Sequence, residues 1–187
     1  MKQISRMTMG ELGAYVSSHL AKRGIKVVLS GGACVSIYST NLYRSDDLDF
    51  IESGSSARKQ LKQALEEIGF KENHRYFQHP ETRLFLEFPP GPLAVGREPV
   101  KEVVQKRYST GILRLISPTD CVKDRLAAYF HWNDLQSLEQ ALLVCARNQV
   151  DLREVRHWAK SEGMADEYGK ISRRFQLLQE RSTKSGK

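Results

Sequence analysis

Residues 27–50 read VVLSGGACVSIYSTNLYRSDDLDF, in which a pair of glycines is followed by two aspartates one residue apart. Successive side chains of a β-strand point to opposite faces, so Asp47 and Asp49 would share one face while their apolar neighbours pack on the other. Two carboxylates side by side repel each other unless a cation lies between them. The pattern therefore indicates a divalent metal site.

A third carboxylate is expected on a neighbouring strand. Glu87 is the only acid in residues 84–88, LFLEF, and a core-facing strand has little reason to carry it. A solvent-facing position, or an ion pair with a Lys or Arg, would also account for Glu87. Hard divalent ions prefer oxygen ligands, and magnesium is usually held by a few carboxylates together with substrate phosphates. We therefore expect Asp47, Asp49 and Glu87 to hold Mg²⁺ or Mn²⁺.

The turn at Ser30, Gly31 and Gly32 would present backbone N–H groups to phosphate oxygens without obstruction by side chains. A tight turn that needs positive φ explains the glycines equally well. A dinucleotide-binding turn is a further alternative, because an acid follows at about the distance expected for ribose recognition. However, the G-x-G-x-x-G spacing is absent, and one ribose carboxylate would not explain a second aspartate.

The chain of 187 residues is long enough for one folded unit with a helical extension and too short for two large domains. No apolar run approaches the roughly 20 residues that span a bilayer, and no apolar secretory stretch follows the N-terminus. Cys34, Cys121 and Cys145 show no CxxC spacing, which argues against a disulfide framework or a zinc knuckle. We expect a cytoplasmic protein with no membrane partner.

The formal charge of +7 is concentrated at the C-terminal end. Residues 170–187 contain six basic residues and one acid, which account for five of the seven net positive charges. A basic tail attracts polyanions through counterion release, although solubility is the commoner reason for such a tail. RNA contact by this tail is therefore a hypothesis.

Hydrophobic periodicity predicts the order of the elements. Helices are predicted over residues 9–23, 33–38, 55–68, 117–130, 135–145, 152–160 and 168–180. Strands are predicted over residues 25–29 and 47–51, around Tyr76, and over residues 83–88 and 113–116. Ser117-Pro118-Thr119-Asp120 is a strong helix start, and the prolines of residues 89–92 predict a loop.

This order predicts an α+β fold, with a short mixed β-sheet backed by helices and a C-terminal helical part. The expected division places an α/β core in residues 1–116 and a helical region with the basic tail in residues 117–187.

Gly31-Gly32, Arg44-Ser45 and Asp47-Leu48-Asp49-Phe50 resemble the G-G/S…D-h-D signature of the nucleotidyltransferase superfamily, which has the polymerase-β-like fold. The resemblance is strongest to the small AbiEii-like toxin-type branch. It covers residues 25–87 well and the helical part loosely. It implies a nucleotidyltransferase fold in which a glycine turn holds a nucleoside triphosphate and a D-h-D pair with a third acid holds magnesium.

The resemblance also implies roles for individual residues. Asp47, Asp49 and Glu87 would hold the metal, and Glu87 would help to activate the acceptor hydroxyl. By the resemblance, Ser30 and Gly31 would contact phosphate. Gly32 in the same turn, and Arg44 just before the metal strand, are also expected to bind the nucleotide. A guanidinium suits phosphate as a bidentate donor, but pairing with Asp46 would equally explain Arg44.

Lys123 and Asp134 lie where the AbiEii-like branch has a lysine and, about one helix further on, an acid. Lys123 would face a phosphate, and Asp134 would orient that lysine or the acceptor. The alternatives are that Lys123 is a solvated helix residue and that Asp134 is a first-turn acid favoured by the helix dipole.

Other candidates have ordinary structural explanations. A Trp after an apolar stripe, such as Trp132, is more often core than a stacking platform for bases, and His131 beside it is more often structural than functional. Capping and surface exposure account for Asp120 and Asp124. Cys34 has no identifiable base nearby, so we expect a small buried thiol.

These observations favour an enzyme that moves a nucleoside monophosphate from a nucleoside triphosphate to a hydroxyl of RNA, a protein or a small molecule. A role in a toxin–antitoxin pair, restrained by an antitoxin-like partner protein, is compatible with this activity. The alternative is a catalytically silent nucleotidyltransferase fold that binds a nucleotide or a partner. The intact acidic cluster argues against this alternative. Like charges placed close together are costly, so a protein that had lost the chemistry would be free to replace these residues.

Overall fold

The computed structural model describes residues 2–52, 54 and 58–185, with side chains described up to residue 181. Its helices are η1 Ile4–Arg6, α1 Met9–Lys22, α2 Gly31–Tyr38, α3 Arg58–Glu66, α4 Pro118–Trp132, α5 Leu135–Arg147, α6 Leu152–Ser161 and α7 Ala165–Ser185. Its strands are β1 Val27–Ser30, β2 Asp47–Glu52, β3 Lys71–Asn73, β4 Tyr76–Gln78, β5 Phe85–Glu87, β6 Ala94–Val95, β7 Glu98–Pro99, β8 Val103–Tyr108 and β9 Gly111–Ile116.

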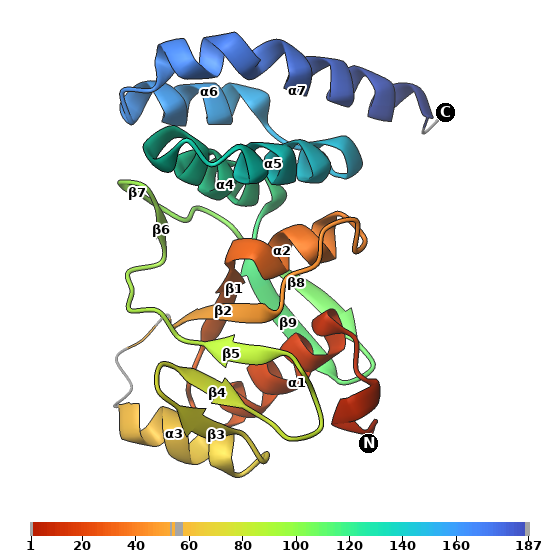
Figure 1. Ribbon diagram of the computed structural model, residues 1–187, viewed down its shortest axis with the longest axis vertical. Coiled ribbons are helices and arrows are strands. Elements are labelled where there is room, and N and C mark those ends of the chain that lie inside the picture. Colours follow the sequence, from red (N-terminus) through yellow and green to blue (C-terminus); the bar gives the residue numbers. More distant parts are fainter. Residues whose placement is uncertain (1, 53, 55–57, 186–187) are drawn as a thin grey trace.

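The architecture is α+β, as predicted. A seven-stranded mixed sheet has the order β3-β4-β5-β2-β1-β9-β8, while β6 and β7 form a separate hairpin. Helices α1 and α3 lie behind the sheet, and α4 to α7 form a helical layer above it (Figure 1). Helix α2 packs on both α4 and α5 and so joins the sheet to the helical layer.

The central strands set the register on which the site depends. Strand β2 pairs antiparallel with β1 and parallel with β5. In the parallel pairing Asp49 lies opposite Glu87. Because paired residues point to the same face, two acids that are 38 positions apart in the sequence become neighbours.

Local signals explain where two helices begin. Helix α1 starts with a capping box, in which the Thr8 hydroxyl accepts from the backbone N–H of Glu11 and the Glu11 carboxylate accepts from the backbone N–H of Thr8. Helix α4 starts at Ser117, whose hydroxyl accepts from the backbone N–H of Asp120, with proline at the first helical position. The predicted helix start at Ser117 is therefore confirmed.

The helical layer also holds the β6–β7 hairpin. The indole N–H of Trp158 in α6 donates to the backbone O of Val95 at 3.2 Å, and the backbone N–H of Arg97 donates to the Glu162 carboxylate at 2.8 Å. The chain between β5 and β8 thus reaches the helical layer before it returns to the sheet.

The edge strands β3 and β8 were not predicted from the sequence. Their sequences, KEN and VVQKRY, contain charged residues that protect a sheet edge but interrupt apolar alternation. The small hairpin of β6 and β7 was also missed, because two-residue strands leave no periodic signal. The predicted start of the third helix at Ser55 lies outside the described residues. Among the described helices, none has the length and apolar character needed to cross a membrane.

Candidate active site

Asp47, Asp49 and Glu87 converge on one face at the middle of the sheet. Asp47 and Asp49 share a face of β2, and the register with β5 adds Glu87. One carboxylate oxygen from each residue lies within 4.8 Å of the others. All three side chains are partly buried. This acidic triad, predicted from the sequence, has the oxygen donors and the spacing that suit a hard divalent ion.

The electrostatics of the triad also suit a cation. Burial, followed by the charges of Asp47 and Glu87, raises the pKa of Asp49 from 3.8 to about 7. The negative form of Asp49 is therefore costly when no cation is present. A bound divalent ion would reverse this preference, because it favours the charged form of every carboxylate around it. The residues thus fit Mg²⁺ or Mn²⁺.

Gly31 lies directly against Asp49. Its φ of +64° is in the left-handed region, and a Cβ added there would collide with Oδ2 of Asp49. The Ser30 hydroxyl donates to the backbone O of Asp49 at 3.3 Å. Positive φ and close approach therefore both require glycine at position 31. The close approach brings the N-terminus of α2, with its free N–H groups, beside the triad.

Ser45 orients the other aspartate, and the sequence analysis did not assign it a role. Its hydroxyl donates to Oδ1 of Asp47 at 2.5 Å, and the residue is only 8% exposed. Its backbone N–H donates to the Ser36 hydroxyl of α2 at 2.9 Å. A Cβ added at Gly32 would lie 2.9 Å from the Ser45 hydroxyl, so Gly32 leaves room for it. The available signal was the position of Ser45, two residues before Asp47.

Arg75 is a second residue that the sequence analysis missed. Its Nε lies 3.5 Å from Oε1 of Glu87, and its side chain is 70% exposed. Among the described residues it is the one cationic side chain within ion-pair distance of the triad. Glu87 thus combines two of the expected situations, a place in the triad and an ion pair. Arg75 could not be found from the sequence because it lies in the β3–β4 turn, whose position depends on the pairing of β4 with β5.

Arg44 is exposed and lies in the segment that leads into β2. Together with Ser45 and Asp46 it lines a pocket of about 310 Å³. This pocket also borders the N-terminus of α1. Arg44 is therefore next to the residue that orients Asp47, and its contact with a nucleotide stays a prediction.

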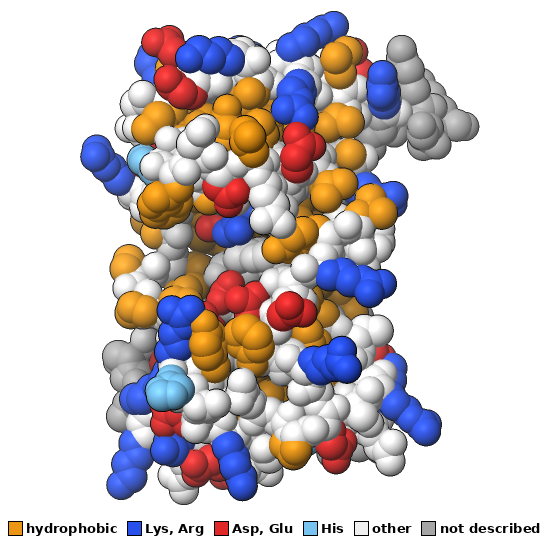
Figure 2. Space-filling view, in the orientation of Figure 1, with side chains coloured by type: hydrophobic (Ala, Val, Ile, Leu, Met, Phe, Trp, Pro, Cys, Tyr) orange, Lys and Arg blue, Asp and Glu red, His pale blue; other side chains and the backbone are white. Residues whose placement is uncertain are grey.

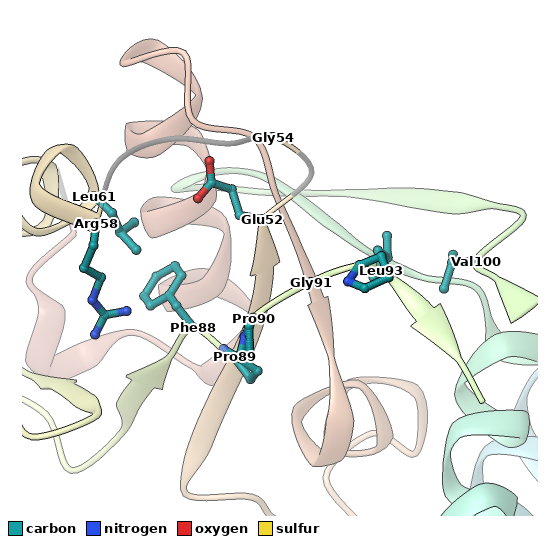
Figure 3. A pocket seen from close by; sticks show the side chains of 11 residues that line it. Glu52, Gly54, Arg58, Leu61, Phe88, Pro89, Pro90, Gly91, Leu93 and Val100 are labelled. Atoms are coloured by element: carbon teal, nitrogen blue, oxygen red, sulfur yellow. The ribbon is translucent and has the colours of Figure 1, made fainter. Parts of the chain in front are cut away.

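A larger pocket than the one beside Arg44 lies elsewhere. It has a volume of about 770 Å³ and lies beyond the ends of β2 and β5, where Glu52 and Phe88 line it. In Figure 3, Arg58 and Leu61 of α3 lie with Phe88 on one side of Gly91. Leu93 and Val100 lie on the other side of Gly91. Because side chains alternate along a strand, Glu52 and Phe88 point to the face opposite the triad. This pocket therefore adds no group to the triad.

Lys123 is buried, with 1% of its side chain exposed, so it is not a solvated helix residue. Its Nζ lies 3.1 Å from Oδ1 of Asp120 and 2.5 Å from Oε1 of Glu154. Burial alone would lower the pKa of Lys123, but the hydrogen bond to Glu154 and the charge of Asp120 outweigh it and raise the pKa. Asp120 lies at the helix cap, as expected, where it bonds with Ser117, but it is buried rather than exposed and also accepts from this lysine. Contact of Lys123 with a phosphate stays a prediction.

Asp134 is the N-cap of α5. Its carboxylate accepts from the backbone N–H groups of Gln136 and Ser137 and from the Ser137 hydroxyl. The hydroxyl of Ser137 is the main reason that the pKa of Asp134 is lowered. The structure therefore supplies a capping role for Asp134, and its role toward Lys123 or the acceptor stays a prediction.

Two other expectations had different outcomes. Trp132 is 75% exposed, so its assignment to the core was wrong. It lies two residues beyond Phe130 of the apolar stripe, which is roughly 200° around the helix axis, and His131 packs edge-on against it. Cys34 is a buried thiol, as expected, and burial raises its pKa.

No model of a known protein family matches this sequence, and no curated protein matches it. An antigenic nucleotidyltransferase-like protein from Paracoccidioides brasiliensis has a similar structure, with a TM-score of 0.57 and 12% identity over 90% of this chain and 92% of that chain. A solution structure of the antibiotic-resistance factor ANT(2'')-Ia has a TM-score of 0.48 and 14% identity over 95% of this chain and 93% of that chain. A crystal structure of ANT(2'')-Ia with adenylyl-2''-tobramycin has a TM-score of 0.46 and 15% identity over 92% of this chain and 95% of that chain. The fold of this chain is therefore the nucleotidyltransferase fold, as the first of these likenesses shows.

Proposed function

We propose that this protein is a metal-dependent nucleotidyltransferase that moves a nucleoside monophosphate from a nucleoside triphosphate to a hydroxyl acceptor. The observation that carries the proposal is the convergence of Asp47, Asp49 and Glu87 beside the glycine turn at Gly31. A carboxylate set for a hard ion next to a helix N-terminus suits a metal-bound triphosphate.

Each part of the site would have its own role in the transfer reaction. The triad would hold Mg²⁺ or Mn²⁺, which when bound polarises the phosphate and lowers the pKa of the attacking hydroxyl. The N–H groups at the start of α2 would hold the triphosphate, and Arg44 would balance its charge. Glu87 would help to remove the proton of the acceptor hydroxyl. The acceptor oxygen forms a bond to the α-phosphorus, and the bond to the leaving pyrophosphate breaks.

Labelled nucleotide transfer tests this proposal. The protein is incubated with each α-³²P-labelled nucleoside triphosphate, Mg²⁺ or Mn²⁺, and total RNA or cell lysate. Transfer is expected with the wild type, and a loss of at least about 100-fold is expected in the Asp47→Asn/Asp49→Asn variant, because the cation loses two of its three charged ligands. Asp46→Asn is the matched control, since Asp46 is adjacent in the sequence but outside the triad. Transfer that persists in the double variant would overturn the proposal.

A toxin role restrained by an antitoxin-like partner is a finer proposal. It rests on the resemblance to the AbiEii-like branch. Growth arrest on expression of the wild type, and its loss in the Asp47→Asn/Asp49→Asn variant, is the expected result. Normal growth at full expression of the wild type would contradict it.

A further inference from the structure

The sheet face that carries the triad continues onto β4 and β3. The antiparallel register pairs Tyr76 with Glu87, and Asn73 with Tyr76. Paired residues share a face, so Tyr76 and Asn73 lie on the face of the triad. The strand order puts β1 and the glycine turn on one side of the triad and β4 and β3 on the other. A nucleotide at the glycine turn would leave this second side free for the acceptor.

Cationic side chains border this side of the triad. Arg75 is largely exposed and touches Glu87. Lys71 and Arg83, both exposed, line a pocket of about 530 Å³ together with the amides Asn73 and Gln78. The acid of β3, Glu72, pairs with Phe77 in the register and so points to the opposite face, where it binds Arg58 and Lys62. This side of the sheet therefore carries three exposed cationic side chains, of which Arg75 contacts the triad.

Two aromatic rings lie on the same face beside the triad, because Tyr76 pairs with Glu87 and Phe85 pairs with Asp47. The rings of Tyr76 and Phe85 meet edge to face with centroids 4.6 Å apart, and both residues are partly exposed. The Arg75 guanidinium lies 4.7 Å from the centroid of Tyr76. Figure 2 shows this side of the molecule, with acidic side chains in the hollow below the helical layer, hydrophobic side chains beneath them and Lys or Arg side chains to either side.

We propose that this face, defined by Lys71, Arg75, Tyr76 and Arg83, binds the acceptor and that the acceptor is the 3′ end of a single-stranded polynucleotide. A terminal base stacks on Tyr76, since stacking on an aromatic ring tolerates any base. Arg75 contacts the nearest phosphate, which suits a guanidinium better than any other side chain. The terminal hydroxyl then reaches Glu87. A polycationic small acceptor is repelled by the same cations, whereas a polynucleotide is attracted.

This inference rests on the proposed function, because the triad gives the terminal hydroxyl its reaction. Its test is a binding measurement that needs no turnover. Fluorescence anisotropy follows labelled single strands of about 12 nucleotides, as RNA and as DNA, between ~50 and ~200 mM KCl. The variants are Arg75→Ala, Arg75→Lys and Tyr76→Leu. The matched control is Arg173→Ala/Arg174→Ala in the basic helix α7.

The variants have distinct expected signatures. Arg75→Ala weakens binding about 5-fold or more and lowers the slope of log K against log salt by roughly 0.7, the value for one lost phosphate contact on a single strand. Arg75→Lys restores the slope because it restores the charge. Tyr76→Leu weakens binding about 5-fold without changing the slope, since stacking releases no counterions. The α7 variant binds like the wild type.

Three results would overturn the inference: no binding of single strands, equally tight binding of a duplex, or binding that depends on α7 and not on Arg75. RNA and DNA binding with the Arg75 dependence both support it, and their ratio identifies the preferred sugar. If single strands do not bind while nucleotide label still enters another acceptor, the inference fails and the proposed function stands. If label enters no acceptor while single strands bind through Arg75, the proposed function fails and the binding face stands.

Discussion

The Ser45 hydroxyl donates a 2.5 Å hydrogen bond to Oδ1 of Asp47 and thereby fixes the direction of that carboxylate. The bond occupies one oxygen of Asp47 and leaves Oδ2 for a cation. Ser45 is itself held by Ser36 of α2, so that helix and the segment leading into β2 are linked. Partners that orient a metal ligand typically contribute about 10- to 100-fold to metal affinity.

Ser45→Ala is therefore expected to weaken Mn²⁺ binding about 10-fold, measured by electron paramagnetic resonance of free Mn²⁺. Ser45→Thr keeps the hydroxyl and is expected to retain most of the affinity. Urea unfolding of each metal-free variant reports whether the fold is intact. Equal Mn²⁺ affinity of the Ala variant and the wild type would show that Asp47 needs no such partner.

Gly31→Ala is expected to destabilise the protein and to disturb the triad. The residue has a φ of +64°, and its new Cβ would collide with Oδ2 of Asp49. Gly163 is the matched control, because its φ is +78° and no atom lies within 4 Å of an added Cβ. Gly163→Ala is expected to cost about 1 kcal/mol, the effect of backbone strain alone.

Gly31→Ala is expected to lower the free energy of unfolding by about 3 kcal/mol, since collision adds to strain. Mn²⁺ binding should weaken in Gly31→Ala and stay unchanged in Gly163→Ala. Urea unfolding and Mn²⁺ titration measure the two effects. If both variants lose the same stability and keep the same Mn²⁺ affinity, then Asp49 does not depend on the space at Gly31.

The pKa of Asp49 predicts how stability depends on pH when metal is removed by EDTA. In the folded protein this pKa is raised from 3.8 to about 7, so folding favours the protonated carboxyl. The stabilisation is present below about pH 4 and is lost as pH rises through about 7. Asp49→Asn cannot ionise and should escape this loss.

Urea unfolding at about pH 5 and about pH 8 measures the difference between Asp49→Asn and the wild type. The stability advantage of the variant is expected to grow between these values by about 2 kcal/mol, since one pKa unit corresponds to ~1.4 kcal/mol. Mn²⁺ at about pH 8 should stabilise the wild type and not the variant. Parallel pH profiles of the two metal-free proteins would contradict the raised pKa.

The sequence predicted the parts of the site that depend on local periodicity. Asp47 and Asp49 share a strand, so alternation alone placed them together. The place of Glu87 required that β5 pair with β2, which the resemblance implied but periodicity did not. The contact of Arg75 with Glu87 depends on a further pairing, between β4 and β5, which no local sequence pattern predicts.

The helical part shows the same limit. Its helices follow from apolar stripes and N-caps, and their bounds were predicted to within a few residues. The burial of Lys123 was not predictable, because its partner Glu154 lies 31 residues further along the chain on another helix. In this part of the chain, contacts between helices, rather than the helices themselves, were what the sequence left open.

Lys123 predicts a strong coupling with Glu154. The ammonium is buried and its 2.5 Å contact with Glu154 joins α4 to α6, while Asp120 lies 3.1 Å away. Lys123→Met leaves the buried carboxylate of Asp120 without its cation, so the expected loss in the free energy of unfolding is about 3 kcal/mol. Glu154→Gln should lower the free energy of unfolding by about 1 kcal/mol, because Glu154 is partly exposed and Lys123 keeps its ion pair with Asp120.

A double-mutant cycle by urea unfolding separates this coupling from the two single effects. In the Lys123→Met/Glu154→Gln variant the loss in the free energy of unfolding is expected to be smaller than the sum of the two single losses by about 1 kcal/mol or more. The second substitution there removes a carboxylate that has already lost Lys123, its closer cation, and keeps Lys101 at 3.4 Å. An exposed pair offers the comparison: Arg174 and Glu139 lie 2.8 Å apart on α7 and α5. Coupling between Arg174→Ala and Glu139→Ala should stay below about 0.5 kcal/mol, as for other solvated pairs. Additive losses for Lys123 and Glu154 would mean that their contact does not join α4 to α6 energetically.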